Sequence, residues 1–126
     1  MATIAVIDDE QVVRDVLREM LIRVGHTVVC FPDAAPFLKY VDANLFDLVI
    51  TDFHMPTCGE QVVAAMAQKG FPAPVIVMSG NMTNEIACLM LAMGAHAVLQ
   101  KPMRIQNFLA VVRKWLTLRP VFESGN

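Results

Sequence analysis

Five polar residues that could support phosphoryl chemistry each follow a short apolar run of the sequence. They are Asp8, Asp9, Asp52, Ser79 and Lys101. Carboxylates that lie close together repel one another and raise each other's pKa unless a cation is present. A hard divalent ion with oxygen ligands, such as magnesium (Mg²⁺), would relieve that repulsion. A carboxylate beside such an ion and a lysine can attack phosphorus, because both cations neutralise charge on the transferring oxygens.

Asp52 ends a run rich in β-branched residues, from Leu48 to Thr51. The run is too short for a helix, and its continuous apolar character predicts a strand buried on both faces of a sheet. A carboxylate at the end of such a strand is costly unless another group pairs with it. Asp52 therefore needs partners from elsewhere in the chain.

Each of the other polar residues also has a purely structural interpretation. The acidic run at residues 8–10 is typical of a helix N-terminus, where carboxylates cap backbone N–H groups and favour the helix dipole. Ser79-Gly80-Asn81 is typical of an ordinary turn, and Lys101 alone could be a surface lysine. The coincidence of all these residues at predicted strand ends favours a common site.

Short apolar runs alternate with segments of helical periodicity along the chain. The predicted strands cover residues 3–7, 27–31, 46–51, 75–78 and 95–99, and the predicted helices cover residues 11–24, 34–41, 59–69, 83–93 and 104–118. This alternation favours right-handed crossovers and an α/β fold, a parallel sheet with helices on both faces. In such sheets ligands bind at the carboxyl ends of the strands, where the five polar residues fall. The alternation leaves the order of the strands open.

The composition bounds the class of protein. A chain of 126 residues has the usual size of one domain. It is 56% hydrophobic and 17% charged, against about 25% charged in average soluble domains, which indicates that some apolar side chains lie in an interface. The net charge of -2, with scattered basic residues, argues against nucleic-acid binding.

The N-terminal residues lack a signal-peptide pattern, and no segment approaches the ~18 apolar residues that a membrane span requires. We therefore expect a cytoplasmic protein that does not bind a membrane. Cys30, Cys58 and Cys88 form an odd, widely spaced set that fits neither a disulfide framework nor a zinc site. Reduced thiols are expected.

Several short motifs stand at the predicted strand ends. They are Ile7-Asp8-Asp9-Glu10, Asp52 followed by Met55-Pro56, Ser79-Gly80, Gly94-Ala95 before the fifth strand, and Lys101-Pro102. With these motifs the chain resembles the receiver domain of two-component response regulators over essentially its whole length. The resemblance implies a flavodoxin-like, doubly wound sheet of five parallel strands in the order 2-1-3-4-5, with five helices and the site at the switch point. It assigns residues 1–119 to the receiver domain and residues 120–126 to a short C-terminal tail.

The resemblance also implies roles for the acidic residues. Asp52 would take a phosphoryl group from the phosphohistidine of a histidine kinase or phosphotransfer protein. Asp9 and Asp52 would bind Mg²⁺ directly, together with the backbone carbonyl of His54, and Asp8 would bind it through water.

The remaining site residues would act on the phosphoryl group. Lys101 would pair with it, and Ser79 would swing in to hydrogen-bond it. The Lys101-Pro102 peptide bond would be cis. His54 and Asn81 occupy variable positions that flank the acyl phosphate in this family, so we expect them to set its lifetime.

Two departures from the family pattern concern signalling. Receivers usually carry an aromatic residue three positions before the lysine, where this chain has Val98, which has no ring to switch. His96 should face the same side of the strand as Val98. It is a candidate to substitute for the missing ring, but we expect it to face solvent instead. Gly59 comes seven positions after Asp52 rather than eight, so the loop between them is one residue shorter than usual.

The expected output is a protein contact, and a homodimer is one possibility. The downstream partner would bind the surface of the fourth helix, fifth strand and fifth helix. That surface includes Met82, Leu91, Met93, Val98, Met103 and Trp115. Some of these side chains exceed what the core can accommodate, although methionines also fill gaps in cores. One alternative is a degenerate receiver that serves only as a scaffold. A phosphatase is disfavoured, because such enzymes usually carry a second aspartate two residues after the nucleophile, where this chain has His54. No enzyme activity beyond self-phosphorylation and slow autodephosphorylation is expected.

Overall fold

Five parallel strands form the single sheet of this computed structural model, which describes residues 2–40 and 45–118. The strands are β1 (Thr3–Ile7), β2 (Thr27–Phe31), β3 (Leu48–Asp52), β4 (Val75–Ser79) and β5 (Ala97–Gln100). Their order in the sheet is β2-β1-β3-β4-β5. The predicted flavodoxin-like architecture, including the strand order, is confirmed.

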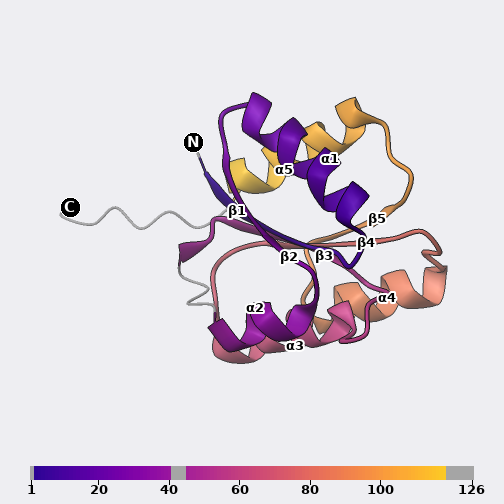
Figure 1. The fold of residues 1–126 in the computed structure, drawn as a ribbon. Coiled ribbons are helices and arrows are strands. Elements are labelled where there is room, and N and C mark those ends of the chain that lie inside the picture. Colours follow the sequence, from indigo (N-terminus) through magenta and orange to yellow (C-terminus); the bar gives the residue numbers. More distant parts are fainter. Residues whose placement is uncertain (1, 41–44, 119–126) are drawn as a thin grey trace.

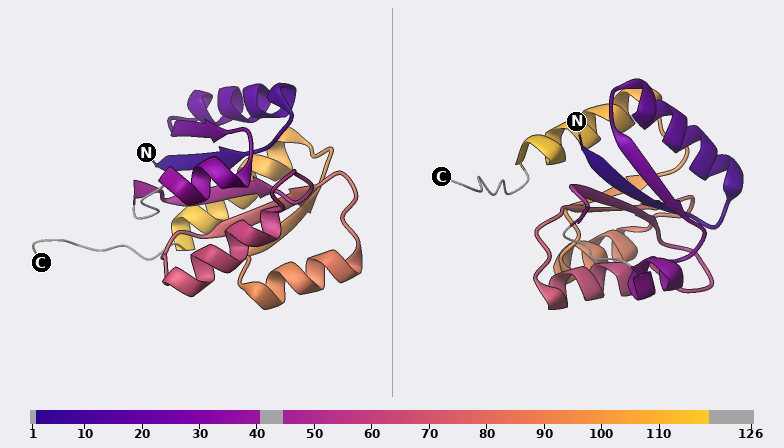
Figure 2. Two further views of the ribbon diagram at one scale, coloured as in Figure 1. Left: turned by 60° about the horizontal axis from the view of Figure 1, so that its bottom comes forward. Right: turned by 60° about the vertical axis from the view of Figure 1, so that its left-hand side comes forward.

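Five helices connect the strands and cover both faces of the sheet. They are α1 (Gln11–Arg23), α2 (Ala34–Tyr40), α3 (Gly59–Lys69), α4 (Asn84–Met93) and α5 (Ile105–Leu118). Helices α1 and α5 lie on one face, and α2, α3 and α4 lie on the other (Figures 1 and 2). The predicted boundaries agree to within two residues. The predicted last residue of the second helix, Val41, and the predicted tail 120–126 lie outside the described residues.

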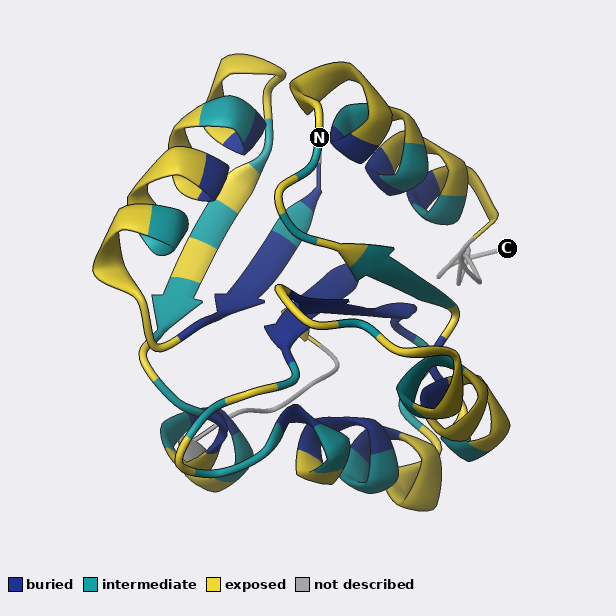
Figure 3. Cartoon of the chain, turned by 90° about the vertical axis from the view of Figure 1, so that its right-hand side faces the viewer, coloured by how far each residue is buried: buried dark blue, intermediate teal, exposed yellow. Residues whose placement is uncertain are grey.

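Two apolar cores, one on each face, hold these layers together. One core joins the sheet to α2, α3 and α4, and the other joins it to α1 and α5. Every residue of β3 and β4 is buried, whereas the edge strand β2 has no fully buried residue (Figure 3). Burial on both faces explains why the β3 and β4 segments are continuously apolar instead of alternating. Asp52 and Ser79 are carried at the ends of these two rigid strands.

The fourth helix begins at Asn84, one residue after its predicted start. Thr83 is its N-cap, and the Thr83 hydroxyl accepts a hydrogen bond of 3.1 Å from the Ile86 N–H. The helix ends at Met93, and the positive φ of 118° at the following Gly94 suits a left-handed C-cap. The Ala95 N–H still bonds back to Met90 of the helix, so β5 starts only at Ala97, two residues later than predicted.

This late start overturns the predicted side of His96. The His96 ring packs edge-on against Trp115 of α5, with 5.3 Å between ring centroids, and its Nδ1 accepts a hydrogen bond of 3.1 Å from the Val75 N–H. Val98 packs against the core on the opposite face. The strict alternation of a strand does not reach back to His96, because this residue precedes the strand. His96 is exposed, as expected.

Two further predictions are tested by the fold. All three cysteines are free thiols, as expected. Within the described ranges, none of the helices combines the length and the apolar character that crossing a bilayer would demand.

Candidate functional site

The predicted site residues meet at the carboxyl edge of the sheet. Asp8 directly follows β1, Asp52 and Ser79 are the last residues of β3 and β4, and Lys101 directly follows β5. A cavity of about 390 Å³ opens there, and its lining residues are Asp9, Glu10, Asp52, His54, Gly80, Asn81 and Lys101. Four strand ends that are far apart in sequence thus supply one polar pocket.

Lys101 is the cation at the centre of this cluster. Its Nζ lies 2.7 Å from Asp8 Oδ2 and 3.2 Å from Asp52 Oδ1. Asp8 has no exposed surface and Asp52 is 4% exposed. One ammonium group therefore neutralises only one of two buried carboxylates. When both carboxylates are ionised, the three groups together carry a net negative charge.

The surroundings of Asp52 shift its acidity. Burial and the negative charge of Asp8 raise the pKa of Asp52 to about 6, although the positive charge of Lys101 partly offsets them. For Lys101, burial lowers the pKa, but its hydrogen bond to Asp8 and the charge of Asp52 outweigh burial and raise it. Lys101 thus stays protonated, while ionised Asp52 lacks full compensation.

The acidic run after β1 serves both the loop and the site. Asp8 Oδ1 accepts a hydrogen bond of 2.9 Å from the Glu10 N–H, and the Arg14 guanidinium donates one of 2.7 Å to the Asp8 carbonyl oxygen. Carboxylate oxygens of Asp8, Asp9 and Glu10 lie within 4.8 Å of one another. Within the described part of the chain, the Asp9 carboxylate makes no hydrogen bond or ion pair.

The chemistry of these donors suits a hard divalent cation. Asp8, Asp9 and Glu10 offer carboxylate oxygens, which Mg²⁺ prefers. The buried carboxylates of Asp8 and Asp52 also carry more negative charge than the single Lys101 ammonium neutralises. Burial is the main cause of the raised pKa of Asp52, and the charge of Asp8 raises this pKa further. A cation at this edge would reduce the excess of negative charge.

Ser79 lies close to the site with its hydroxyl engaged elsewhere. The side chain is fully buried, and Ser79 Oγ accepts a hydrogen bond of 3.0 Å from the Asn81 N–H. Among the described residues, the hydroxyl makes no bond to Asp52 or Lys101. In this conformation Ser79 is bonded to the loop between β4 and α4. The predicted cis bond is present at Lys101-Pro102.

Gly59 is a residue whose structural role the sequence did not reveal. A Cβ atom placed on Gly59 would collide with the carbonyl oxygen of Asp52. The Gly59 N–H and the Cys58 thiol also donate hydrogen bonds to the Phe53 carbonyl oxygen, at 3.0 and 3.2 Å. The absent side chain therefore lets the first turn of α3 pack directly onto the backbone of Asp52. Its sequence signals were a glycine at a predicted helix start and its spacing of seven positions from Asp52, and neither revealed this contact.

Comparison with known families identifies this arrangement. The family model for the response regulator receiver domain matches residues 4–113. The chain belongs to this family.

Curated and solved relatives agree with the receiver assignment. The response regulator protein TodT of Pseudomonas putida is 29% identical over 98% of this chain and 55% of its own length. The DNA-binding transcriptional regulator NtrC of Rhizobium meliloti is 33% identical over 91% of this chain and 24% of its own length. The solved signal receiver domain of the putative response regulator NarL from Mycobacterium tuberculosis has a TM-score of 0.84 at 27% identity, covering 92% of this chain and 96% of that one. The chain thus spans about half the length of TodT and about a quarter of the length of NtrC.

The receiver's predicted partner surface is only partly exposed. Met82, Met93 and Val98 pack against the core beneath α3 and α4, and Met103 and Trp115 pack against the core beneath α5. Leu91 is the member of the predicted set that is exposed, at 48%, and its neighbour Leu89 is similarly exposed. The prediction of excess apolar side chains therefore holds for α4, whereas the methionines fill gaps in the core.

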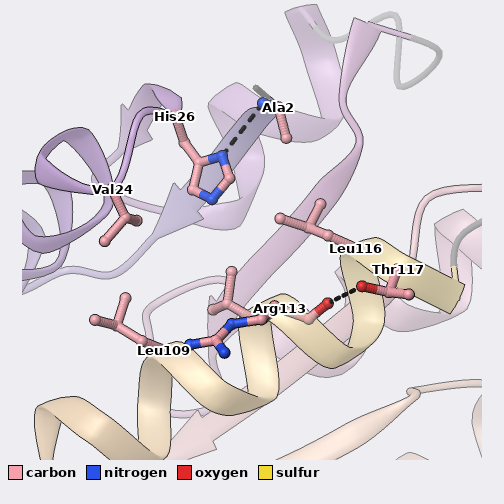
Figure 4. A pocket seen from close by; sticks show the side chains of 8 residues that line it. Ala2, Val24, His26, Leu109, Arg113, Leu116 and Thr117 are labelled. Carbon is pink, nitrogen blue, oxygen red and sulfur yellow. Dashed lines mark hydrogen bonds between the residues drawn. The ribbon is translucent and has the colours of Figure 1, made fainter.

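A second cavity of this receiver lies between α5 and the residues that flank β1 and β2. It measures about 400 Å³ and is lined in part by Val24, His26, Leu109 and Arg113 (Figure 4). His26 Nδ1 accepts a hydrogen bond of 3.2 Å from the Ala2 N–H at this end. None of the predicted site residues lines this cavity.

Proposed function

We propose that this receiver is a phosphoacceptor and that Asp52 receives the phosphoryl group from a phosphohistidine. The observation that carries the proposal is the position of Asp52, on the lining of a polar cavity with Lys101 Nζ 3.2 Å from its carboxylate. A carboxylate oxygen of Asp52 attacks phosphorus, an aspartyl phosphate forms, and the phosphorus–nitrogen bond breaks. The leaving imidazole keeps that electron pair and takes up a proton.

The receiver's own residues prepare this step. The ion pair with Asp8 holds Lys101 at the site. In that position the charge of Lys101 can neutralise phosphoryl oxygens. In our proposal Asp9 and Asp52 hold Mg²⁺ together with the backbone carbonyl of His54, while Asp8 binds it through water. The bound ion supplies further neutralisation of the phosphoryl charge. Ser79 turns from Asn81 toward the phosphoryl oxygens once they are present.

An apolar groove beside the site suits the phosphohistidine donor, a histidine kinase or phosphotransfer protein. The groove of about 540 Å³ runs between α1 and the β5–α5 connection, and it shares Glu10, Gly80 and Lys101 with the site cavity. Val12 on α1 is 73% exposed and Ile105 on α5 is 56% exposed. A donor helix covering these side chains would bury apolar surface while its phosphohistidine reaches Asp52.

The output in this proposal is a change in protein binding, without turnover of a separate substrate. Exposed Leu89 and Leu91 make α4 the apolar part of the surface for a downstream partner or a second copy of the chain. We assign this receiver domain to residues 1–119. A scaffold that never takes phosphate is the alternative, and the complete set of acidic, hydroxyl and lysine groups favours the phosphoacceptor.

Intact mass measurement after incubation with acetyl phosphate and Mg²⁺ tests the proposal. We expect wild type to gain the mass of one phosphoryl group and Asp52→Asn to gain none, because the nucleophilic oxygen is lost. Wild type without added mass, or Asp52→Asn with the same gain as wild type, would rule out Asp52 as the phosphoacceptor. Steady release of phosphate from a small phosphate ester would instead favour a phosphatase.

Removing one proposed metal ligand should weaken magnesium binding. We expect Asp9→Asn to lower the Mg²⁺ affinity by tenfold or more in calorimetric titration, because a neutral amide replaces a directly coordinating carboxylate. Glu10→Gln is the matched control, since Glu10 is an exposed neighbour of Asp9 in the same acidic group but has no assigned coordination. Equal losses in the two variants would contradict the assignment and indicate only a general effect of negative charge.

A further inference from the structure

Gln100, the last residue of β5, ties that strand to the loop that begins α4. Its Nε2 donates hydrogen bonds of 2.8 Å to the Gly80 carbonyl oxygen and 2.9 Å to the Lys101 carbonyl oxygen. Its Oε1 accepts one of 3.0 Å from the Met82 N–H. Because the partners are two acceptors and one donor, only this orientation of the amide satisfies all three bonds.

These bonds hold the segment that Ser79 must disturb. Ser79 is paired with Gln100 in the sheet register, and its backbone carbonyl accepts a hydrogen bond of 2.8 Å from the Lys101 N–H. Its hydroxyl is bonded to Asn81, between the two loop residues that Gln100 contacts. Turning the hydroxyl toward a phosphoryl group breaks the bond to Asn81 and frees this loop on one side. On the other side, Gln100 opposes any movement.

We propose that Gln100 is a positioning residue that clamps the Gly80–Met82 loop in the unphosphorylated conformation and couples Ser79 to α4. The inference rests on the proposed phosphorylation of Asp52. Met82 immediately precedes Thr83, the N-cap of α4, so displacement of the Met82 N–H moves the first turn of that helix. Val98 has no ring to link β5 with this loop, and the Gln100 amide supplies a polar link two residues further along β5.

The clamp has a thermodynamic consequence. A contact made only in the resting conformation lowers the population of the active conformation, so its removal shifts the equilibrium toward the active form. A ligand that binds the active conformation then binds more tightly, because less of its binding free energy is used in the shift. Losing two exposed neutral hydrogen bonds to the loop should change the ratio of active to resting conformation by about three- to tenfold.

Beryllofluoride titration of the full chain tests the clamp, because this complex mimics a phosphoryl group on an aspartate. We expect Gln100→Ala to bind it, in the presence of Mg²⁺, about three- to tenfold more tightly than wild type. In amide NMR spectra, the resonances of Gly80 and Met82 in the free variant should shift toward their positions in the beryllofluoride-bound wild type. Gln106→Ala on exposed α5 is the control and should match wild type.

A second variant separates coupling from a merely structural role. Gln100→Glu keeps an acceptor for the Met82 N–H but places a carboxylate oxygen opposite the Gly80 carbonyl oxygen. This repulsion opposes the clamped conformation, so the beryllofluoride affinity should rise at least as much as in Gln100→Ala. Unchanged or weaker beryllofluoride binding by folded Gln100→Ala, with wild type binding normally, overturns the clamp alone. Wild type that takes up neither beryllofluoride nor phosphoryl mass overturns the proposed function, and the clamp with it.

Discussion

Gly59→Ala is expected to lower the free energy of unfolding by about 2–3 kcal/mol. The added methyl group would collide with the carbonyl oxygen of Asp52, and a backbone atom of a buried strand end has little freedom to move away. Relief requires a shift of α3 against β3, which disturbs the core between them. Urea unfolding at pH 7, with midpoint and slope compared to wild type, measures the loss.

Gly80→Ala is the matched control for this substitution. Gly80 also lies at the site edge, but a Cβ placed there meets no atom within 4 Å and its φ is not positive. Its unfolding free energy should stay within about 0.5 kcal/mol of wild type. Equal losses in the two variants would show that Gly59 is sensitive for a reason other than its approach to Asp52.

Asp52→Asn should stabilise the metal-free protein at neutral pH by about 2–3 kcal/mol. The ordinary pKa of 3.8 applies to Asp52 in the unfolded chain, whereas the folded value is about 6. The folded state therefore binds the Asp52 proton more tightly, so ionisation of this carboxyl destabilises the fold. Wild type loses this stability as the pH rises from near 3.8 through about 6, and asparagine, which stays neutral, does not.

Denaturant unfolding in EDTA at several pH values checks this prediction. The variant and wild type should have similar stability near pH 4, diverge as the pH rises from about 4 to about 6, and keep a constant difference above pH 6. Asp33→Asn is an internal control of opposite sign. Burial raises the pKa of Asp33, but hydrogen bonds, first among them that from Thr57, outweigh burial and lower it. Asp33→Asn should thus be less stable than wild type at pH 7. This deficit should shrink as the pH falls through the lowered pKa of Asp33 in the folded protein. An Asp52→Asn protein less stable than wild type at pH 7.5 would contradict the account.

The sequence predicted the fold and the site well where one physical rule applied at a time. The continuously apolar runs at β3 and β4 could only be buried strands, and parallel strands bring their carboxyl ends to one edge. Asp52, Ser79 and Lys101 were therefore predicted at one edge of the sheet, and the structure has them at the carboxyl ends of β3, β4 and β5. The order of the strands came from the family resemblance, since alternation alone does not fix it.

The residues that sequence reasoning missed act through long-range geometry. Gly59 is special because α3 folds back onto the carbonyl of Asp52, which no local pattern reveals. Gln100 is special because a neighbouring strand presents Gly80 and Met82 to its amide. The side of His96 was wrong because alternation was extended past the start of β5. The roles of Gly59, Gln100 and His96 all depend on the three-dimensional position at which a helix or strand begins or ends.

The sheet separates two cores that share no helix, and this makes the receiver modular. The groove proposed for the phosphohistidine donor lies over the core beneath α1 and α5. The exposed leucines of α4 lie over the core beneath α2, α3 and α4. Val16 lines the groove and Leu91 lies on α4, so the energetic effects of substitutions at these two separate sites should add. Selection can thus retune the α1 side of the donor groove without altering the exposed leucines of α4. The same separation lets a designer graft a new donor specificity onto an existing response.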